Sequence, residues 1–301
     1  MEVIAEPERF RRACDEARRS GTEVGFVPTM GDLHQGHARL IKAARDDGCL
    51  VALSVFVNPL QFDSAADLRA YPRGLERDRV VASSLGVDLL FAPSESAMYP
   101  RGRPGISVDP GLLGERLEGS SRPGHFRGVL TVVAKLLNLA GPCRAYFGEK
   151  DAQQLALVWR MADELNVPVQ VMGCPTVREF DGLALSSRNA RLSPQERRAS
   201  VALFEALSEA ATQVRQGERR GDVIRAGMAR RIAAEPLAAL DYVAVVDERT
   251  WEDVGQLDGP ARALVAARFG ATRLIDNARL PWSGGEDMHN GGMHGLPREG
   301  A

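Results

Sequence analysis

The chain of 301 residues is 44% hydrophobic and 26% charged, which is ordinary for a soluble globular protein. Its formal net charge of −2 provides no basic surface for nucleic acid or for an anionic membrane, and its four widely spaced cysteines disfavour a zinc site or a disulfide framework. With no signal-like N-terminus and no apolar run of transmembrane length, we expect a cytoplasmic protein that binds neither nucleic acid nor membrane.

Through the first 175 residues, apolar strand-like runs alternate with helical patterns. Helices are predicted at 7–20, 36–47, 75–85, 125–139 and 153–165, and strands at 23–28, 50–57, 88–92, 145–147 and 169–172. The continuous apolar run at 50–57 is typical of a strand buried on both faces. This alternation predicts an α/β fold with a Rossmann-like doubly wound parallel sheet, whose ligands bind at the carboxyl ends of the strands.

The pattern changes after about residue 180. Helices are predicted at 194–214, opened by Ser193 as N-cap and Pro194 at the first position, and at 222–234. Strands follow at 241–246, 261–269 and 273–277. We therefore predict a first domain at 1–177, a smaller C-terminal α+β domain at 178–282, and a disordered tail at 283–301 that is rich in glycine and polar residues.

The turn PTMGDLHQGH at residues 28–37 links a predicted strand to a predicted helix. Gly31 and Gly36 would let the backbone approach a ligand, and the amides at the start of the helix would point at an anion. His34 and His37 could then face a nucleotide phosphate. Two alternatives stay open: the histidines could cap or pack the helix, or they could bind a metal, although no clear third ligand is present.

A second predicted strand ends in two carboxamide residues, Asn58 and Gln61, with a proline between them. Carboxamides at such a strand end can bind hydroxyl and carboxylate groups, although a simple Asn-Pro turn explains this pattern better when it is taken alone. Farther on, Arg122 and His125 stand at the head of an apolar helix. The start of a packed helix accounts for most of this pair, and Arg122 stays a candidate for the substrate side.

A third strand passes through Gly148 into Lys150, Asp151 and Gln154 at the start of a helix. Lys150 could neutralise a phosphate and Asp151 could join the coordination of a metal, or both could be a solvated helix start.

A polar loop carries Ser186, Ser187 and Arg188. Two hydroxyls and a guanidinium suit a triphosphate. The same sequence would also serve as an interdomain loop.

Taken in order, six strings resemble those of the pantoate–β-alanine ligases, the pantothenate synthetase family of HxGH nucleotidyltransferases: PTMGDLHQGH, SVFVNPLQF, YPR, RPGHFRGV, YFGEKDAQQL and TVREFDGLALSSRN. Their joint occurrence between residues 25 and 189 is far more specific than any single motif. The resemblance implies that ATP adenylates (R)-pantoate with Mg²⁺, and that β-alanine then displaces AMP. It also implies a homodimer.

The resemblance assigns roles residue by residue. It places His34, His37 and Lys150 at catalytic positions. The positions that match ATP-binding residues are Met30, His34, His37, Gly148, Lys150, Asp151, Val177, Ser186, Ser187 and Arg188. Pantoate would contact Met30, Gln61 and Gln154, and Arg122, Tyr71 and Asn58 are candidates for the β-alanine or substrate side. Asp151 is the candidate Mg²⁺ ligand.

The chain departs from the family pattern at Leu185, where many members carry methionine, and at Asp32, where alanine is common. The first change preserves volume. The second places a carboxylate beside incoming phosphates, so we expect it to affect ATP affinity.

Three other functions stay open from the residues. One is an HxGH nucleotidyltransferase with another acceptor, such as a phosphopantetheine or nicotinamide mononucleotide. The others are a non-catalytic nucleotide-binding module and a metal hydrolase. The NPLQF and GEKDAQQL strings argue against the first.

Overall fold

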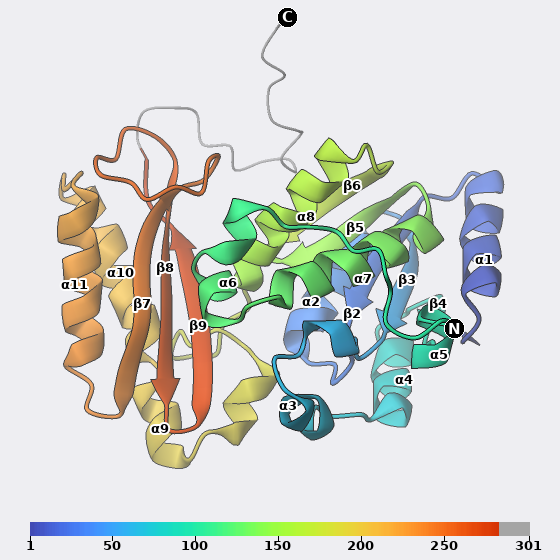
Figure 1. Ribbon diagram of the computed structural model, residues 1–301, viewed down its shortest axis with the longest axis horizontal. Helices are drawn as coiled ribbons and strands as arrows, with labels where there is room; N and C mark the ends of the chain where they lie inside the picture. Colours follow the sequence, from blue (N-terminus) through green and yellow to red (C-terminus); the bar gives the residue numbers. More distant parts are fainter. Residues whose placement is uncertain (283–301) are drawn as a thin grey trace, which may run out of the picture. The chain divides into compact units, whose positions relative to one another are not determined.

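The computed structural model describes residues 1–282, which form two compact units, Met1–Pro175 and a second that begins at Thr176 (Figure 1). The predicted domain boundary followed residue 177, but Val177 is tied to the second unit because its carbonyl accepts a hydrogen bond from the Leu185 amide at 2.9 Å. The predicted tail at 283–301 lies outside the described residues. Within residues 1–282, no helix is long and apolar enough to cross a membrane.

The first unit contains a six-stranded parallel sheet with helices. Across the sheet the strands are β1 (Glu2–Ile4), β4 (Leu89–Phe91), β3 (Leu50–Val55), β2 (Val24–Thr29), β5 (Cys143–Gly148) and β6 (Val169–Cys174). The main helices are α1 (Pro7–Arg19), α2 (Gln35–Asp46), α4 (Leu75–Ser84), α7 (His125–Ala140) and α8 (Ala152–Glu164). The shorter helices are α3 (Ala65–Ala70), α5 (Glu95–Met98) and α6 (Glu118–Ser121). The predicted doubly wound fold is confirmed.

The strand order reverses between β2 and β5. After β2 the chain adds β3 and β4 on one side, and then returns to add β5 and β6 on the other. Ligands of such sheets bind outside the carboxyl ends of the strands at this switch point. The loops that follow β2, β3 and β5 are therefore the expected location of a site.

Apolar strands stabilise the centre of this sheet. β2 and β3 are buried along most of their length, and Ile41 of α2 packs into the same cluster with Leu53 of β3 and Leu90 of β4. Burial on both faces confirms the expectation from the run at 50–57. The short strand β1 was not predicted, because three residues give no readable periodicity and only Ile4 is buried.

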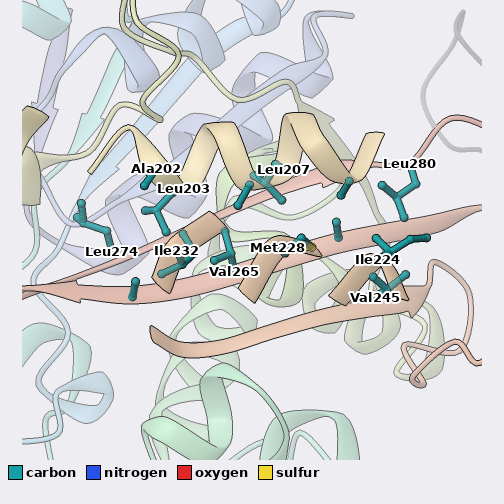
Figure 2. Close-up of a cluster of buried hydrophobic side chains, with 14 of the residues drawn as sticks. Ala202, Leu203, Leu207, Ile224, Met228, Ile232, Val245, Val265, Leu274 and Leu280 are labelled. Atoms are coloured by element: carbon teal, nitrogen blue, oxygen red, sulfur yellow. The ribbon is translucent and has the colours of Figure 1, made fainter. Parts of the chain in front are cut away.

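The second unit packs helices on a three-stranded antiparallel sheet, β7 (Ala238–Asp247), β8 (Ala261–Phe269) and β9 (Thr272–Arg279). Figure 2 shows its core, where Leu203 and Leu207 of α10 (Ala202–Arg215) and Met228 of α11 (Gly221–Ala233) lie against the sheet. The predicted small α+β domain is confirmed.

The single helix predicted at 194–214 is wrong. α9 (Pro194–Ala199) ends before α10 begins, and Ser200 stands at the break, fully buried. Its hydroxyl donates to the Arg197 carbonyl at 2.8 Å, and the Val201 amide bonds three residues back in place of four. Such local side-chain bonds compete with helix continuation.

Candidate active site

The turn after β2 places two imidazoles against each other at the start of α2. Nδ1 of His34 accepts a hydrogen bond from the Gly36 amide at 3.0 Å, and the His34 amide donates to Nδ1 of His37 at 3.3 Å. The ring centroids lie 4.1 Å apart. Because each Nδ1 is an acceptor, the proton of each neutral ring is on Nε2. Both histidines therefore cap the helix and still have an Nε2–H donor for a ligand.

Both rings are uncharged at neutral pH. Burial, helped by the neighbouring His34, lowers the pKa of His37 to about 3. Burial and then the charge of Lys150 lower the pKa of His34, while Asp32 and Asp151 act in the opposite direction. The pair therefore offers neutral donors, and Lys150 is the cation near it.

Gly36 is required for this arrangement. A Cβ built on Gly36 would lie 2.7 Å from Cε1 and 2.9 Å from Nδ1 of the His34 ring. Any larger residue would push the ring away from the amide that it caps. The glycine between the two histidines therefore makes room for the His34 imidazole.

The backbone amides of the turn are already bonded to side chains. The Gly31 amide donates to the Thr29 hydroxyl at 3.1 Å, and the amides of Asp32 and Leu33 donate to the two carboxylate oxygens of Asp78 at 3.1 and 2.8 Å. Asp78 lies on α4 and is 2% exposed. Asp78 therefore occupies the amides of the turn itself, which precede the amides at the start of α2 that the sequence predicts to point at an anion.

Asp78 also fixes an unusual backbone conformation. Gly31 and Asp32 both have positive φ, +86° and +53°. A Cβ on Gly31 would lie 2.7 Å from Oδ2 of Asp78. Glycine adopts a positive φ readily, whereas the positive φ of Asp32 is uncommon, and the buried carboxylate bonds the amide that follows each residue.

The loop after β3 carries Gln61 on the 3₁₀ turn η1 (Pro59–Gln61). Its Oε1 accepts from Nδ2 of Asn58 at 2.9 Å, and its Nε2 lies 3.1 Å from Sδ of Met30, beside the histidine turn. The predicted pantoate residues Met30 and Gln61 are thus brought together. Asn58 is only 1% exposed and bonds groups of the protein, so its assignment to the substrate side is not supported.

The first turns of helix α7 pack against the backbone of the Gln61 loop. A Cβ on Gly128 would lie 2.2 Å from the Leu60 carbonyl oxygen, so only glycine permits this close approach. His125 Nδ1 donates to the Gln61 carbonyl at 2.8 Å, and its Nε2 accepts from Arg122 at 3.1 Å. Arg122 also donates to the Asp63 carboxylate at 2.8 Å. Arg122 is thus largely engaged in fixing the loop.

Stability is expected to fall as the pH drops below about 6.5. Unfolded histidines take up protons near that pH. In the folded state the pKa of His37 is about 3, and burial followed by the charge of Arg122 lowers that of His125 to about 4. The unfolded state therefore binds more protons in this window, and the free energy of unfolding should decrease by up to about 1.4 kcal/mol per pH unit for each histidine.

Urea denaturation between pH 7.5 and 4.5 measures this slope. In His37→Asn, the Asn oxygen can replace the acceptor Nδ1. The free energy of unfolding should then depend less steeply on pH, by the contribution of about one bound proton. An unchanged slope would contradict the assignment of a neutral, buried His37.

The loop after β5 holds the predicted basic group. Gly148 ends the strand, and Lys150 is mostly buried, with Nζ 3.6 Å from Oδ1 of the half-exposed Asp151. The charge of Lys150 lowers the pKa of His34, and the charge of Asp151 raises it. Gln154 lies in the first turn of α8 and is partly exposed. Strands β2 and β5 are adjacent, which brings these loops together.

The remaining predicted residues have other surroundings. Tyr71, at the end of α3, packs edge-on against Phe62 with ring centroids 5.5 Å apart. In the second unit, Ser186 caps the 3₁₀ turn η4 (Ser187–Arg191), its hydroxyl accepting from the Arg188 amide at 3.2 Å. Ser187 and Arg188 are partly exposed on that turn.

A sequence profile of the family described as pantoate-beta-alanine ligase matches residues 2–279. The chain belongs to the pantoate-β-alanine ligase family. Its relatives include the pantothenate synthetase of Rubrobacter xylanophilus, 51% identical over 93% of this chain and 98% of that protein. The pantothenate synthetase of Heliobacterium modesticaldum is 53% identical over 87% of this chain and 93% of its own length.

Solved structures of the pantoate-β-alanine ligase family have the same fold. The crystal structure of pantothenate synthetase from Thermus thermophilus gives a TM-score of 0.86 at 46% identity, covering 92% of this chain and 99% of that chain. The ligase from Francisella tularensis, complexed with beta-gamma ATP and beta-alanine, gives a TM-score of 0.74 at 34% identity, covering 92% and 97%. The predicted family and fold class are confirmed.

Sequence reasoning missed three buried residues of this pantoate-β-alanine ligase family member. They are Asp78, Tyr99 and Gln153, and Nε2 of Gln153 donates to the carbonyls of Leu113 and Arg116. Asp78 has charged neighbours in the sequence, and its helix α4 has few apolar residues on one face. No local signal separates it from a solvated carboxylate.

Proposed function

We propose that this chain catalyses the ATP-dependent condensation of (R)-pantoate with β-alanine, giving pantothenate, AMP and pyrophosphate. The observation that carries the proposal is the meeting of the β2 and β5 loops at the switch point, with two Nε2–H donors and a lysine, in a chain of this family. A homologous ligase complexed with ATP and β-alanine supports ATP as the co-substrate.

The reaction needs stabilised phosphates more than a side-chain nucleophile. A pantoate carboxylate oxygen attacks the α-phosphorus of ATP, a new P–O bond forms, and the bond to pyrophosphate breaks. The β-alanine amine then attacks the acyl carbon, and AMP leaves with the bonding electrons while the amine loses a proton. Donors and cations placed where the phosphate charge develops lower the barrier of the first step.

We assign the phosphate donors to the histidine turn and to Lys150. His37 and Lys150 would stabilise the α-phosphate in the transition state, and His34 would bind the outer phosphates. Because both imidazoles are neutral, they contribute directed hydrogen bonds and Lys150 contributes the charge.

The acid is assigned to Gln61, Gln154 and Met30. The Gln61 carboxamide is fixed beside Met30, and among residues 1–282 no other side chain hydrogen-bonds Gln154. We reassign Asn58, and Arg122 in large part, to positioning the Gln61 loop. Tyr71, which packs on Phe62, stays a candidate only through the resemblance to the family.

The resemblance to the family supports Gly148 as a further nucleotide-binding residue. It also supports nucleotide-binding roles for Val177, Ser186, Ser187 and Arg188, which belong to the second unit. Hydroxyls and a guanidinium are suitable partners for phosphate oxygens. Ser186 has a structural bond to the Arg188 amide, and its O–H can still donate.

Mg²⁺ is proposed to bind mainly through the phosphates. No cluster of three or more His, Cys, Asp or Glu side chains among the described residues could hold a metal ion. The half-exposed Asp151 fits a single carboxylate ligand, which suits a cation that keeps waters and substrate oxygens. Bound there, Mg²⁺ would neutralise phosphate charge.

Asp32→Asn is expected to lower the KM for ATP about two- to threefold. The charge of Asp32 acts on His34, and Arg77, 3.7 Å away and exposed, neutralises it only in part. Asparagine tolerates the positive φ of Asp32, so the turn should persist. Steady-state kinetics at low and high salt measure the effect, which should shrink with screening. An unchanged KM at low salt would show that the carboxylate does not act on ATP.

The activity is tested by incubating the protein with pantoate, β-alanine, ATP and Mg²⁺ and omitting each in turn. AMP should form only in the complete mixture, and ATP–pyrophosphate exchange should need pantoate without β-alanine. ATP–pyrophosphate exchange that does not require pantoate would favour a related nucleotidyltransferase. ATP binding without exchange would favour a non-catalytic nucleotide-binding module.

We further propose a homodimer in the cytoplasm. The four cysteines, Cys14, Cys49, Cys143 and Cys174, are buried free thiols, which suits a reducing compartment. The dimer rests on the resemblance to the family, and sedimentation of the full chain tests it.

A further inference from the structure

A chain of hydrogen bonds connects a buried tyrosine to the carboxamide assigned to pantoate. The hydroxyl of Tyr99, which follows α5 and is 6% exposed, donates to Oδ1 of Asn58 at 2.8 Å. Nδ2 of Asn58 donates to Oε1 of Gln61 at 2.9 Å, and Nε2 of Gln61 lies 3.1 Å from Sδ of Met30. Every bond lies within the first unit.

Two backbone groups determine the direction of this chain. The Leu60 amide, which can only donate, is 3.3 Å from Oδ1 of Asn58, and the Gly128 carbonyl, which can only accept, is 3.1 Å from Nδ2. The oxygen and the nitrogen of the Asn58 carboxamide are therefore fixed. Nδ2 must donate to Gln61, so Oε1 of Gln61 points at Asn58 and its NH₂ group points to the Met30 side.

We propose that Tyr99 and Asn58 are positioning residues that fix Gln61 as a hydrogen-bond donor toward the acid substrate. The site would then select an acceptor oxygen of pantoate, a carboxylate or hydroxyl oxygen, at this place. A free glutamine can rotate by 180° and present either atom, and the chain of bonds removes that choice. The inference rests on the proposed function, in which Gln61 contacts pantoate.

The tyrosine hydroxyl can be removed with little change in packing. The ring of Tyr99 lies 5.9 Å from that of Phe56, and Nζ of Lys135 is 5.7 Å from the centroid of the Tyr99 ring. Tyr99→Phe keeps both contacts and deletes only the donor to Asn58. A matched control is Tyr146→Phe, which deletes another buried hydroxyl whose partner is the Asp47 carboxylate at 2.6 Å.

The test is pantoate-dependent ATP–pyrophosphate exchange. Tyr99→Phe should raise the KM for pantoate about three- to tenfold, the range expected for one lost hydrogen bond, while the KM for ATP stays within about twofold. Tyr146→Phe should leave both constants unchanged. A pantoate KM within about twofold of wild type in Tyr99→Phe would overturn the proposal.

A double-mutant cycle separates positioning from packing. Gln61→Ala should raise the pantoate KM, and Tyr99→Phe added to it should have no further effect, because the group that Tyr99 orients is gone. If the two substitutions have additive effects on the pantoate KM, and the wild-type protein is active, the positioning role of Tyr99 is overturned. The proposed function is then unaffected. A wild-type protein without pantoate-dependent exchange would overturn the proposed function itself.

Discussion

Lys150→Ala is expected to lower the rate of pantoate-dependent AMP formation about a hundredfold, and at least tenfold. Lys150 is mostly buried beside the histidine pair, and both imidazoles are neutral because burial lowers their pKa values. The loss of Lys150 would leave the α-phosphate in the transition state without the cation that the β5 loop supplies. One directed group in a site is typically worth about 10²–10³ in rate.

The matched control for Lys150 is Lys42→Ala on α2. Lys42 is exposed and pairs with Asp46 on the surface at 2.7 Å, so its removal should leave turnover unchanged. Single-turnover measurements with saturating ATP separate the chemical step from binding. A folded Lys150→Ala protein with near wild-type AMP release would remove Lys150 from the proposed mechanism.

Asp78→Asn is expected to lower the free energy of unfolding by about 1–3 kcal/mol and to reduce turnover about tenfold or more. Asparagine retains one acceptor oxygen for the amides of Asp32 and Leu33, and its NH₂ group would oppose the other amide. The turn would shift, and His34 with it. Small misplacements of binding groups are costly for rate.

Urea denaturation and steady-state kinetics together test this role of Asp78. The effect should fall on ATP and on turnover, whereas the KM for pantoate should change little, because Gln61 is fixed by other residues. Glu76→Gln, on the same helix but exposed and paired with Arg79, is the control and should behave as wild type. Equal losses for ATP and pantoate would point to general unfolding in place of a shifted turn.

The sequence correctly predicted that the histidine turn links a strand to a helix. It did not predict which side chains bond the backbone amides of the turn. Strand, turn and helix at residues 24–46 follow from local signals, namely an apolar run, two glycines and a polar helix start. Which groups bond the backbone amides could not follow, because Asp78 comes from another helix. The role of Gly36 likewise depends on where the His34 ring lies in three dimensions.

The Gln61 loop illustrates the same division. The Asn-Pro pattern indicated a strand end with carboxamides, and Gln61 does lie there. Both carboxamides were assigned to the substrate because local sequence does not distinguish a ligand-facing amide from a buried one. Asn58 is buried because it bonds the Gly128 carbonyl of α7 and the hydroxyl of Tyr99, which follows β4 in the sequence. These contacts link residues that are far apart in the chain.

By itself, the sequence determined the family, the α/β class and the three loops proposed to carry the chemistry, because periodicity, glycine placement and motif order are local properties. Only the tertiary structure decided how these loops meet. The order of β2 and β5 in the sheet brings His34, His37 and Lys150 to one edge. Burial there makes the imidazoles neutral, and fixed backbone groups orient Gln61. Strand order, burial and hydrogen-bond direction depend on long-range packing, which no local pattern records.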